Sequence, residues 1–493
     1  MAISIYRSAI TAALTLLTAE GAVRTLEEQQ DAGECAKNAQ TGDQYFPADY
    51  LATYRTLGAV GNLDGPISSA ELIQIDYGSN FKVLTEKFAQ EQYVLTQCGT
   101  LAPTDAEINA VKTLPSGYTR KHFSIPLQEV RAESTVQLTF LDVLGLHDRV
   151  SYISKYAVGS CWQKSISCGG VAHDSYSNQT LMSEQRAAVD AFFADCPWDY
   201  STNAPNCKAL NSMAKAVHFS ASQDPAPLHS AEHVKFMAAF FNKEEAAEQF
   251  FQSKVSAMEA LKQESSAIDS DKPLVAWIEK SWDGKVKLST ADYQKLLVEY
   301  AGGEMVDAAA VKSALGDKMD ASHQVNAANV SAFFDALKDV DAVIDLTYSS
   351  DVATYDFEAF LKGYGLESSS ELPFIRNEKV FRVDSHVSGK SNLDWFESRL
   401  AQPDMAVEGL QRVLKPDSSK PKKYFRNIAT GEAGEVVKKD ACTAKLMTCN
   451  PSDYPAELPM IDKLGQVSSA VGQLSMSAVF TVSLAVATAV TLV

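Results

Sequence analysis

The sequence is poor in positive charge. Its 493 residues carry 44 Lys and Arg against 62 Asp and Glu, so the formal net charge at pH 7 is −18. Proteins that bind nucleic acid or anionic membranes need clustered positive charge on one surface. The composition therefore argues against a nucleic-acid partner.

Signatures of catalysis are also missing. The glycine-rich segment 363–368 lacks the third glycine of a dinucleotide-binding turn, and Ser388-Gly389-Lys390-Ser391 ends like a phosphate loop but has Asp384 in place of the first glycine. There is no Gly-x-Ser-x-Gly elbow and no His-Glu-x-x-His helix. His229 and His233 have the spacing of a metal-binding pair, but we interpret them as partly solvated residues in the first turn of a helix. We therefore expect no enzyme activity, no bound metal and no cofactor.

Charge is sparse at both ends of the chain. Arg7 is followed by the uncharged run Ser8–Ala19, and small residues near Gly21 predict a signal peptide over residues 1–21. No charge follows Lys463, and Leu474–Val493 has about the length that spans hydrocarbon. This tail is interpreted as a removable glycolipid (GPI) anchor signal, with a true membrane span and a structural helix as alternatives. The two ends predict passage through the secretory pathway to the cell surface or plasma membrane, or to an endosome.

The eight cysteines contain no Cys-x-x-Cys pair, which argues against zinc, and an even number in a secreted chain favours disulfides. Short loops favour the pairs Cys161–Cys168, Cys196–Cys207 and Cys442–Cys449, which leaves Cys35 for Cys98. Sequons at Asn178 and Asn329 are candidate glycosylation sites and agree with a eukaryotic secretory route.

Apolar strand-like and helix-like segments alternate through the middle of the chain, which predicts an α/β fold. The longest helical pattern begins after Ser230 and continues to about Gln263, and such a helix would be about 48 Å long and shared between two lobes. Residues 184–194 are expected to form another helix. The predicted parts are a signal peptide (1–21), an N-terminal leader (22–80), a first α/β lobe with a disulfide-rich insertion (81–229), an interlobe helix (230–264), a second α/β lobe (265–416), a stalk (417–463) and a hydrophobic anchor (464–493).

Ligands of open α/β sheets lie beyond the carboxyl ends of the strands. Flat aromatic rings at these ends would stack on a large, partly apolar ligand, although each ring could equally pack in a core. Trp395 is the strongest candidate because it follows the polar loop Ser388–Asn392, whereas Trp162 could simply fill the Cys161–Cys168 loop. The candidate ligand-binding residues are Ser134, Thr135, Tyr156, Ser160, Trp162, Phe219, Trp277, Trp282, Tyr348, Trp395 and Phe396.

Four segments carry a resemblance to a known family: 131–150, 228–250, 372–416 and, within the last, the LDWFESRLAQPD run at 393–404. They resemble the periplasmic binding proteins (class III) that capture vitamin B12, haem and ferric siderophores. Together with the eukaryotic secretory features, they are similar to the cobalamin-acquisition proteins of diatoms and other algae. The resemblance covers about residues 92–416. It implies two Rossmann-like lobes joined by one long rigid helix, with cobalamin held between the lobes for delivery to a membrane uptake receptor or transporter.

Two alternatives stay open. A siderophore- or haem-binding protein of the same fold would need cations for an anionic ligand, and the nearby candidates are Arg131, Arg376 and Arg382. A surface enzyme or an adhesion protein would need a buried acid/base pair with perturbed pKa values, or an adhesive surface, and neither can be read from the sequence.

Overall fold

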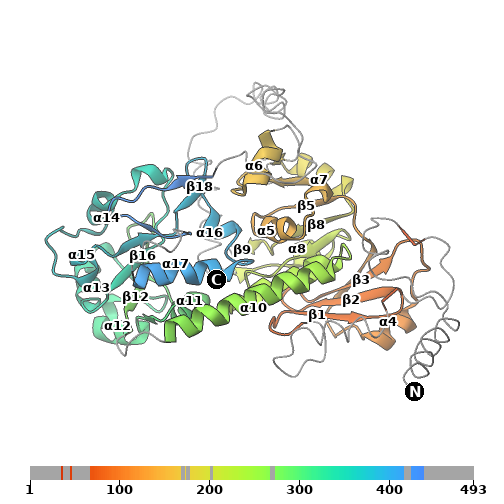
Figure 1. Ribbon diagram of the computed structural model, residues 1–493, viewed down its shortest axis with the longest axis horizontal. Helices are drawn as coiled ribbons and strands as arrows, with labels where there is room; N and C mark the ends of the chain where they lie inside the picture. The colour runs from red at the N-terminus through yellow and green to blue at the C-terminus, as the bar shows by residue number, and fades with distance from the viewer. Residues whose placement is uncertain are drawn as a thin grey trace, which may run out of the picture.

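The chain forms two α/β lobes that lie side by side, with one long helix packed along both (Figure 1). The computed structural model describes residues 35–36, 45–46, 67–167, 172–173, 178–199, 204–266, 272–415 and 423–437. The predicted signal peptide, the hydrophobic tail and Cys442–Cys449 lie outside these ranges. Within them, no helix combines the length and the apolar character that crossing a membrane requires.

A four-stranded sheet precedes the first lobe and packs against it. Its strand order is β1-β2-β3-β4, with antiparallel neighbours except for the parallel pair β3 and β4. Along β2, Phe81 and Val83 face α4, whereas Leu84 belongs to the core of the first lobe, so both faces of this sheet are buried. The elements are β1 (Ile73–Tyr77), β2 (Phe81–Glu86), β3 (Glu91–Gln97), α4 (Asp105–Val111) and β4 (Thr119–Ile125).

This sheet corrects the predicted boundary at residue 80. The expected leader (22–80) contains β1, and the first two strands expected for the lobe belong to a sheet of their own. The sequence could not reveal this separation, because strand pairing depends on contacts between distant segments.

The first lobe is built on a five-stranded parallel sheet of order β11-β8-β5-β6-β7. β8 has the sequence AFFA and is buried throughout, as expected for a parallel strand covered on both faces. These residues fall within the helix predicted over 184–194, and the prediction is wrong there because α7 ends at Ala188. The elements are β5 (Val130–Ala132), α5 (Val136–Val143), η1 (His147–Arg149), β6 (Val150–Ser154), α6 (Ser160–Ser167), β7 (Ala172–His173), α7 (Gln179–Ala188), β8 (Ala191–Ala194), the hairpin β9 (Trp198–Asp199) and β10 (Ala204–Pro205), α8 (Lys208–Asn211) and β11 (Ala216–His218).

Two helices occupy the segment predicted as one long helix. α9 (Pro227–Ala239) is buried almost throughout, and α10 (Glu244–Ser266) follows after a break. At the break Asn242 has a positive φ of 54°, and its side chain accepts from Lys82 at 2.7 Å and donates to Gln97 at 2.9 Å. The expected helix over 230–264 is therefore interrupted, because side-chain bonds to the β1–β4 sheet hold a residue in a conformation that no helix contains.

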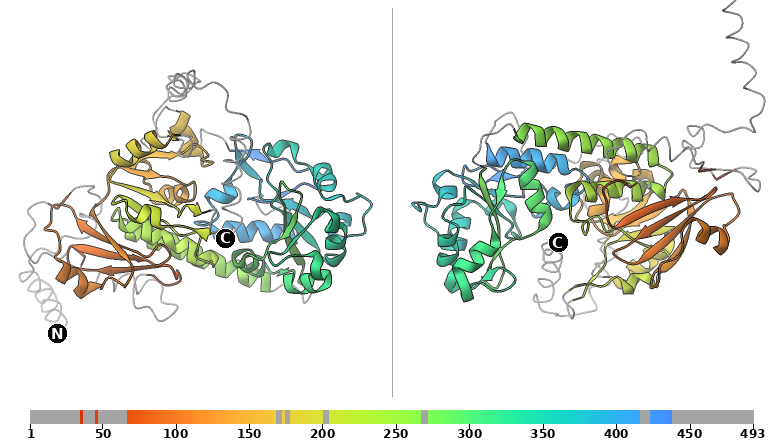
Figure 2. Two further views of the ribbon diagram at one scale, coloured as in Figure 1. Left: turned by 180° about the vertical axis from the view of Figure 1, so that it is seen from behind. Right: turned by 90° about the horizontal axis from the view of Figure 1, so that it is seen from below.

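α10 nevertheless joins the two lobes. Its 23 residues span about 34 Å. Phe251 packs in the core of the first lobe and Met258 in a core of the second, and Figure 2 shows the helix along both lobes in two further views. The expected architecture of two α/β lobes with a single long interlobe helix is confirmed.

The second lobe has a seven-stranded mixed sheet of order β15-β13-β12-β16-β17-β20, in which β14 also pairs with β12. Its centre, β12, β16 and β17, is parallel. The elements are β12 (Leu274–Lys280), β13 (Val286–Leu288), α11 (Asp292–Tyr300), β14 (Glu304–Met305), α12 (Ala308–Leu315), η2 (Gly316–Lys318), β15 (Gln324–Val325), η3 (Ala327–Asn329), α13 (Val330–Ala336), β16 (Ala342–Asp345), η4 (Val352–Thr354), α14 (Phe357–Tyr364), α15 (Pro373–Arg376), β17 (Val380–Arg382), α17 (Pro403–Leu414) and β20 (Arg426–Asn427).

Part of the predicted stalk belongs to this lobe. β20 pairs with β17, and β21 (Glu435–Val436) pairs with β18 (His386–Ser388) in a small sheet that also contains β19 (Asn392–Leu393). The stalk expected from residue 417 is thus corrected for residues 423–437, where strands of two residues are too short to leave a sequence pattern.

The described cysteines form disulfides. Cys35 is joined to Cys98 and Cys196 to Cys207, as predicted, and Cys161 is also disulfide-bonded. Its predicted partner, Cys168, lies outside the described residues.

Candidate functional site

Segments that follow parallel strands of the two lobes contact each other at one place. Ala157 lies just beyond β6 of the first lobe, and its carbonyl accepts from the Ser388 hydroxyl of β18 at 2.7 Å. The short helix α16 (Asp394–Glu397) of the second lobe contacts the loop that follows β6 and contacts α5, and Figure 1 shows it between the lobes. Because ligands of open α/β sheets lie beyond such strand ends, the region around this contact is the candidate site.

Three aromatic side chains near these strand ends are exposed. Tyr156 follows β6 and is 37% exposed, Trp282 lies in the turn after β12 and is 82% exposed, and Tyr348 follows β16 and is 45% exposed. Several large hydrophobic side chains of the described residues are exposed, and these three are the aromatic ones among them. All three are predicted site residues, and they lie on both lobes.

Four predicted aromatic residues pack in cores instead. Trp277 and Trp395 are 0% and 1% exposed, and their ring centroids lie 5.8 Å apart. Phe219 is 1% exposed and packs 4.9 Å from Phe140, and Trp162 is 1% exposed and packs 4.5 Å from His147. The expectation that Trp395 faces a ligand is corrected, because Tyr424 and Phe425 enclose its ring at 5.5 and 5.4 Å. In this arrangement these four side chains have no surface to offer a ligand.

The other predicted residues are intermediate in exposure. Ser134 and Thr135 follow β5, and Ser160 begins α6, so all three lie at the carboxyl edge of the first-lobe sheet. Phe396 is half-buried against the aromatic core that contains Trp395. The structure therefore brings the three hydroxyl residues to the strand ends and places Phe396 at the margin of a core.

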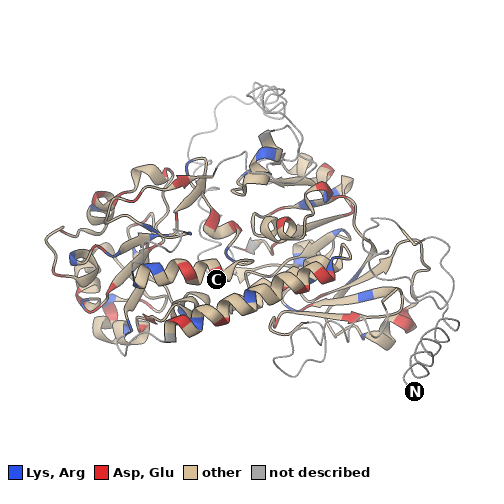
Figure 3. Ribbon diagram, in the orientation of Figure 1, with Lys and Arg blue, Asp and Glu red and all other residues tan. Residues whose placement is uncertain are grey.

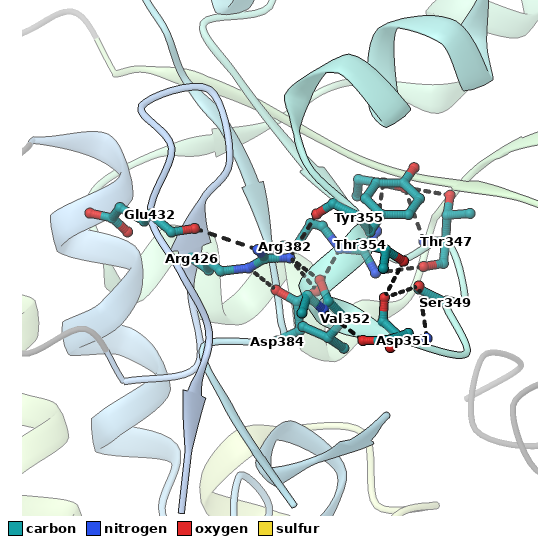
Figure 4. A network of polar contacts seen from close by, with 12 residues as sticks. Thr347, Ser349, Asp351, Val352, Thr354, Tyr355, Arg382, Asp384, Arg426 and Glu432 are labelled. Carbon is teal, nitrogen blue, oxygen red and sulfur yellow. Dashed lines mark hydrogen bonds and ion pairs between the residues drawn. The ribbon is translucent and has the colours of Figure 1, made fainter. Parts of the chain in front are cut away.

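A buried network of charged residues occupies the strand ends of the second lobe (Figure 4). Arg382, at the end of β17, donates to Asp345 at 2.8 Å and to Asp384 at 2.6 Å. Arg426 of β20 also donates to Asp384, at 2.7 Å. The Tyr355 ring lies 3.8 Å from the Arg382 guanidinium, and the network pairs two arginines with two aspartates. It is electrically balanced, so it offers no excess charge to a ligand.

At the strand ends of the first lobe, two arginines share one glutamate. Glu133 accepts from Arg131 at 2.9 Å and from Arg186 at 2.6 Å. Asp195, at the end of β8, lies beside Ser134 and Gln137, and burial raises the pKa of its carboxyl to about 6. Asp384, Arg426 and Asp195 were not predicted, because single charged residues between apolar segments carry no sequence signal for burial.

The described residues give no support for a metal centre at two clusters that have suitable side chains. One consists of Cys196, Cys207 and His218, and the other of Asp142, His147 and Cys161. Each contains disulfide-bonded cysteine, whose sulfur is not a thiolate ligand. His229 and His233 share Asp224, at 3.3 and 3.0 Å, and His233 is fully buried, which corrects the expectation that both are partly solvated.

Acidic and basic residues are interspersed over both lobes (Figure 3). The three arginines considered as partners for an anionic ligand fit this pattern. Arg382 is buried in the balanced network of the second lobe, whereas Arg131 is buried and shares Glu133 with Arg186. Arg376 lies 3.7 Å from Glu371. Each of the three therefore has at least one carboxylate partner.

No protein-family model matches this chain, and no curated protein matches it. Similar solved structures include a periplasmic heme-binding protein from Pseudomonas aeruginosa, with 11% identity and a TM-score of 0.42 over 61% of this chain and 97% of that one. A petrobactin-binding protein (YclQ) from Bacillus subtilis has 12% identity and a TM-score of 0.39 over 59% and 93% of the two chains. A periplasmic binding protein from Veillonella parvula has 11% identity and a TM-score of 0.42 over 59% and 85%. The architecture described above rests on the strand order of this chain and not on these similarities.

Proposed function

We propose that this protein is a non-catalytic solute-binding protein for uptake, and that its ligand is cobalamin (vitamin B12). The ligand would lie between the lobes, at the carboxyl ends of their parallel strands. Besides the two-lobed architecture, the proposal rests on the resemblance of segments 134–145, 228–250 and 393–404 to cobalamin-acquisition proteins.

The observation that carries the proposal is the set of exposed aromatic residues Tyr156, Trp282 and Tyr348. A contiguous exposed apolar surface favours a role in binding, and we infer that these three rings belong to one such surface. Rings at the ends of strands from both lobes could stack on a corrin, which is broad, flat and partly apolar. The hydroxyl residues Ser134, Thr135 and Ser160 could bond the amide groups around its rim.

The charge arrangement favours cobalamin over an anionic ligand. Haem propionates and many ferric siderophores carry negative charge and need cationic partners. In the second lobe Arg382 is paired with both Asp345 and Asp384. In the first lobe Arg131 and Arg186 share Glu133. The amide side chains of a corrin are neutral and would not need such partners.

The proposed role includes a place in the cell. The expected signal peptide, the disulfides and the hydrophobic tail support a protein of the secretory route that acts at a membrane surface. It would hand its ligand to a membrane uptake receptor or transporter.

Calorimetric titration of the purified full-length protein tests the proposal. Cyanocobalamin should bind with a Kd in the micromolar range or below, whereas haemin and ferrichrome should give no binding heat at the same concentrations. Tight binding of haemin or ferrichrome without binding of cyanocobalamin would show that the ligand is a haem or a siderophore and not cobalamin. Absence of binding for all three would remove the proposed function.

A further inference from the structure

Glu397 is a buried carboxylate at the contact between the lobes. It ends α16 of the second lobe and is 2% exposed. One carboxylate oxygen accepts from the backbone N–H of Val158 at 2.6 Å and the other from that of Gly159 at 2.7 Å. Both amides belong to the first lobe, so a single side chain bonds two consecutive residues across the interface.

These amides lie in the loop that joins β6 to α6. The loop begins after Ser154 and ends at Ser160, and it carries the exposed Tyr156. A further bond from the same side of the interface holds it, because the Ser388 hydroxyl donates to the Ala157 carbonyl. The loop that presents Tyr156 is therefore held by three bonds from the opposite lobe, in addition to bonds from Ser154 and Gln163 of its own lobe.

The fit around the carboxylate is close. A Cβ added to Gly159 would lie 2.9 Å from a carboxylate oxygen of Glu397, so a larger residue there would require the carboxylate to shift. The backbone of Glu397 is held as well, since its carbonyl accepts from the Thr139 hydroxyl of α5 at 3.2 Å. Leu400 and Ala401, which follow α16, pack in the core of the first lobe. The contact is thus part of the packed interior and not a loose surface pairing.

The charged groups around Glu397 are mainly acidic. Asp394 of its own helix is paired with Lys423, and Asp142 of α5 lies 2.6 Å from His147. Arg399, beyond α16, is stacked on Trp395 and Tyr293. Burial, with a further contribution from Asp394 and Asp142, raises the pKa of the Glu397 carboxyl to about 8.

We propose that Glu397 is a positioning residue of the binding site: its carboxyl group latches the second lobe to the Val158–Gly159 amides and so fixes the loop that presents Tyr156. The inference deepens the proposed function and rests on it for the role of Tyr156. The latch itself is a property of the ligand-free protein.

The latch should depend on pH. A carboxyl whose pKa is raised in the latched arrangement binds its proton more tightly there than in an opened one, where its pKa would be near the ordinary value of about 4.5. The latched arrangement is therefore favoured at low pH and loses stability as the pH rises through about 8. In the neutral carboxyl the carbonyl oxygen still accepts from one of the two N–H groups, and the hydroxyl oxygen accepts weakly from the other, so protonation does not remove the contact.

Hydrogen exchange in the ligand-free full-length protein tests the latch directly. The measured quantity is the protection of a peptide that covers residues 154–163, relative to its intrinsic exchange rate. In the wild type this protection should fall between pH 6 and pH 9. Glu397→Gln should lower the protection at least about tenfold at pH 6, because its NH2 group places a donor against one of the two backbone N–H groups, and should remove the pH dependence.

Two further variants keep the test decisive. Ser388→Ala removes the interlobe bond to the Ala157 carbonyl and no titrating group, so it should lower the protection but keep the pH dependence. Glu358→Gln makes the same charge change on an exposed residue of α14 and should leave both unchanged. Equal protection and equal pH dependence in the wild type and in Glu397→Gln would overturn the latch.

The positioning role is tested separately with cyanocobalamin. Glu397→Gln should raise the Kd at least about fivefold, whereas Glu358→Gln should not. An unchanged Kd in a variant whose loop has lost protection would overturn the positioning role. If the wild type binds no cobalamin, the proposed function fails, while the exchange measurement still decides whether the latch exists.

Discussion

Replacing Trp395 by alanine separates a core role from a ligand-binding role. The sequence favours a ligand-stacking Trp395, whereas the structure buries its ring to 1% exposure among Trp277, Tyr424 and Phe425. Arg399 adds a contact 4.7 Å above the ring. Trp395→Ala therefore removes the centre of an aromatic cluster and leaves a cavity.

The expected loss is large. Truncation of a buried tryptophan to alanine costs about 3–5 kcal/mol, from lost transfer free energy and from the cavity. A total stability of about 5–15 kcal/mol makes this a substantial fraction of the whole. Trp395→Phe retains most of the packing and should cost clearly less than the alanine variant.

Urea unfolding followed by circular dichroism measures the loss, and Trp282→Ala is the matched control. Trp282 is the same residue type but is 82% exposed, so its removal should change the free energy of unfolding by no more than about 0.5 kcal/mol. The same substitution should weaken cyanocobalamin binding by at least about 1 kcal/mol, as expected for a stacking residue.

The opposite pattern would refute this reasoning. If Trp395→Ala unfolds at the wild-type urea concentration and loses ligand affinity, Trp395 contacts the ligand as the sequence favoured. If Trp282→Ala leaves the affinity unchanged, the exposed ring of Trp282 has no part in the site.

Three further predictions concern stability. Arg382→Met should lower the free energy of unfolding by about 3–5 kcal/mol, because it leaves two buried aspartates without a full set of partners, and urea unfolding against the exposed Arg376→Met measures this; equal losses would contradict it. Removing the Cys35–Cys98 bond should cost more than removing Cys196–Cys207, by about 1.5 kcal/mol on chain-entropy grounds, since 63 residues separate the first pair and 11 the second; thermal unfolding of the two double-serine variants decides the order. Burial raises the pKa of Glu86 to about 7, so its contribution to stability is greatest at low pH and is lost as the pH rises through about 7. Between pH 5 and 7, Glu86→Gln should make the urea concentration at the unfolding midpoint depend less on pH than in the wild type. An equal pH dependence in the two proteins would contradict a raised pKa of Glu86.

The sequence predicts local elements well where the apolar pattern is regular. The apolar patterns of Lys379–Val383 and Val150–Ile153 are typical of strands, and these segments contain β17 and most of β6; the helical pattern before Pro416 is α17. Hydrophobic periodicity is a local property, and these segments need no distant partner to be recognised.

What the sequence could not give depends on distant contacts. Trp395 follows a polar loop, yet that loop folds into β18 and β19 and the ring turns into the core. The break at Asn242 is set by Lys82 and Gln97, more than a hundred residues away. Glu397 follows the aromatic pair Trp395-Phe396, and its sequence neighbours do not predict that its side chain accepts from two backbone amides of the other lobe.

The proposed cobalamin site lies between the two lobes, at the carboxyl ends of their parallel strands. The cobalt of cyanocobalamin scatters anomalously, so a crystal structure of the full chain with this ligand would give the cobalt position without reference to a fitted ligand. A single cobalt peak between the lobes, with the corrin in contact with Trp282 or Tyr348 and with Tyr156, is the predicted result. A peak elsewhere on the protein, or crystals without cobalt at saturating cyanocobalamin, would contradict the claim.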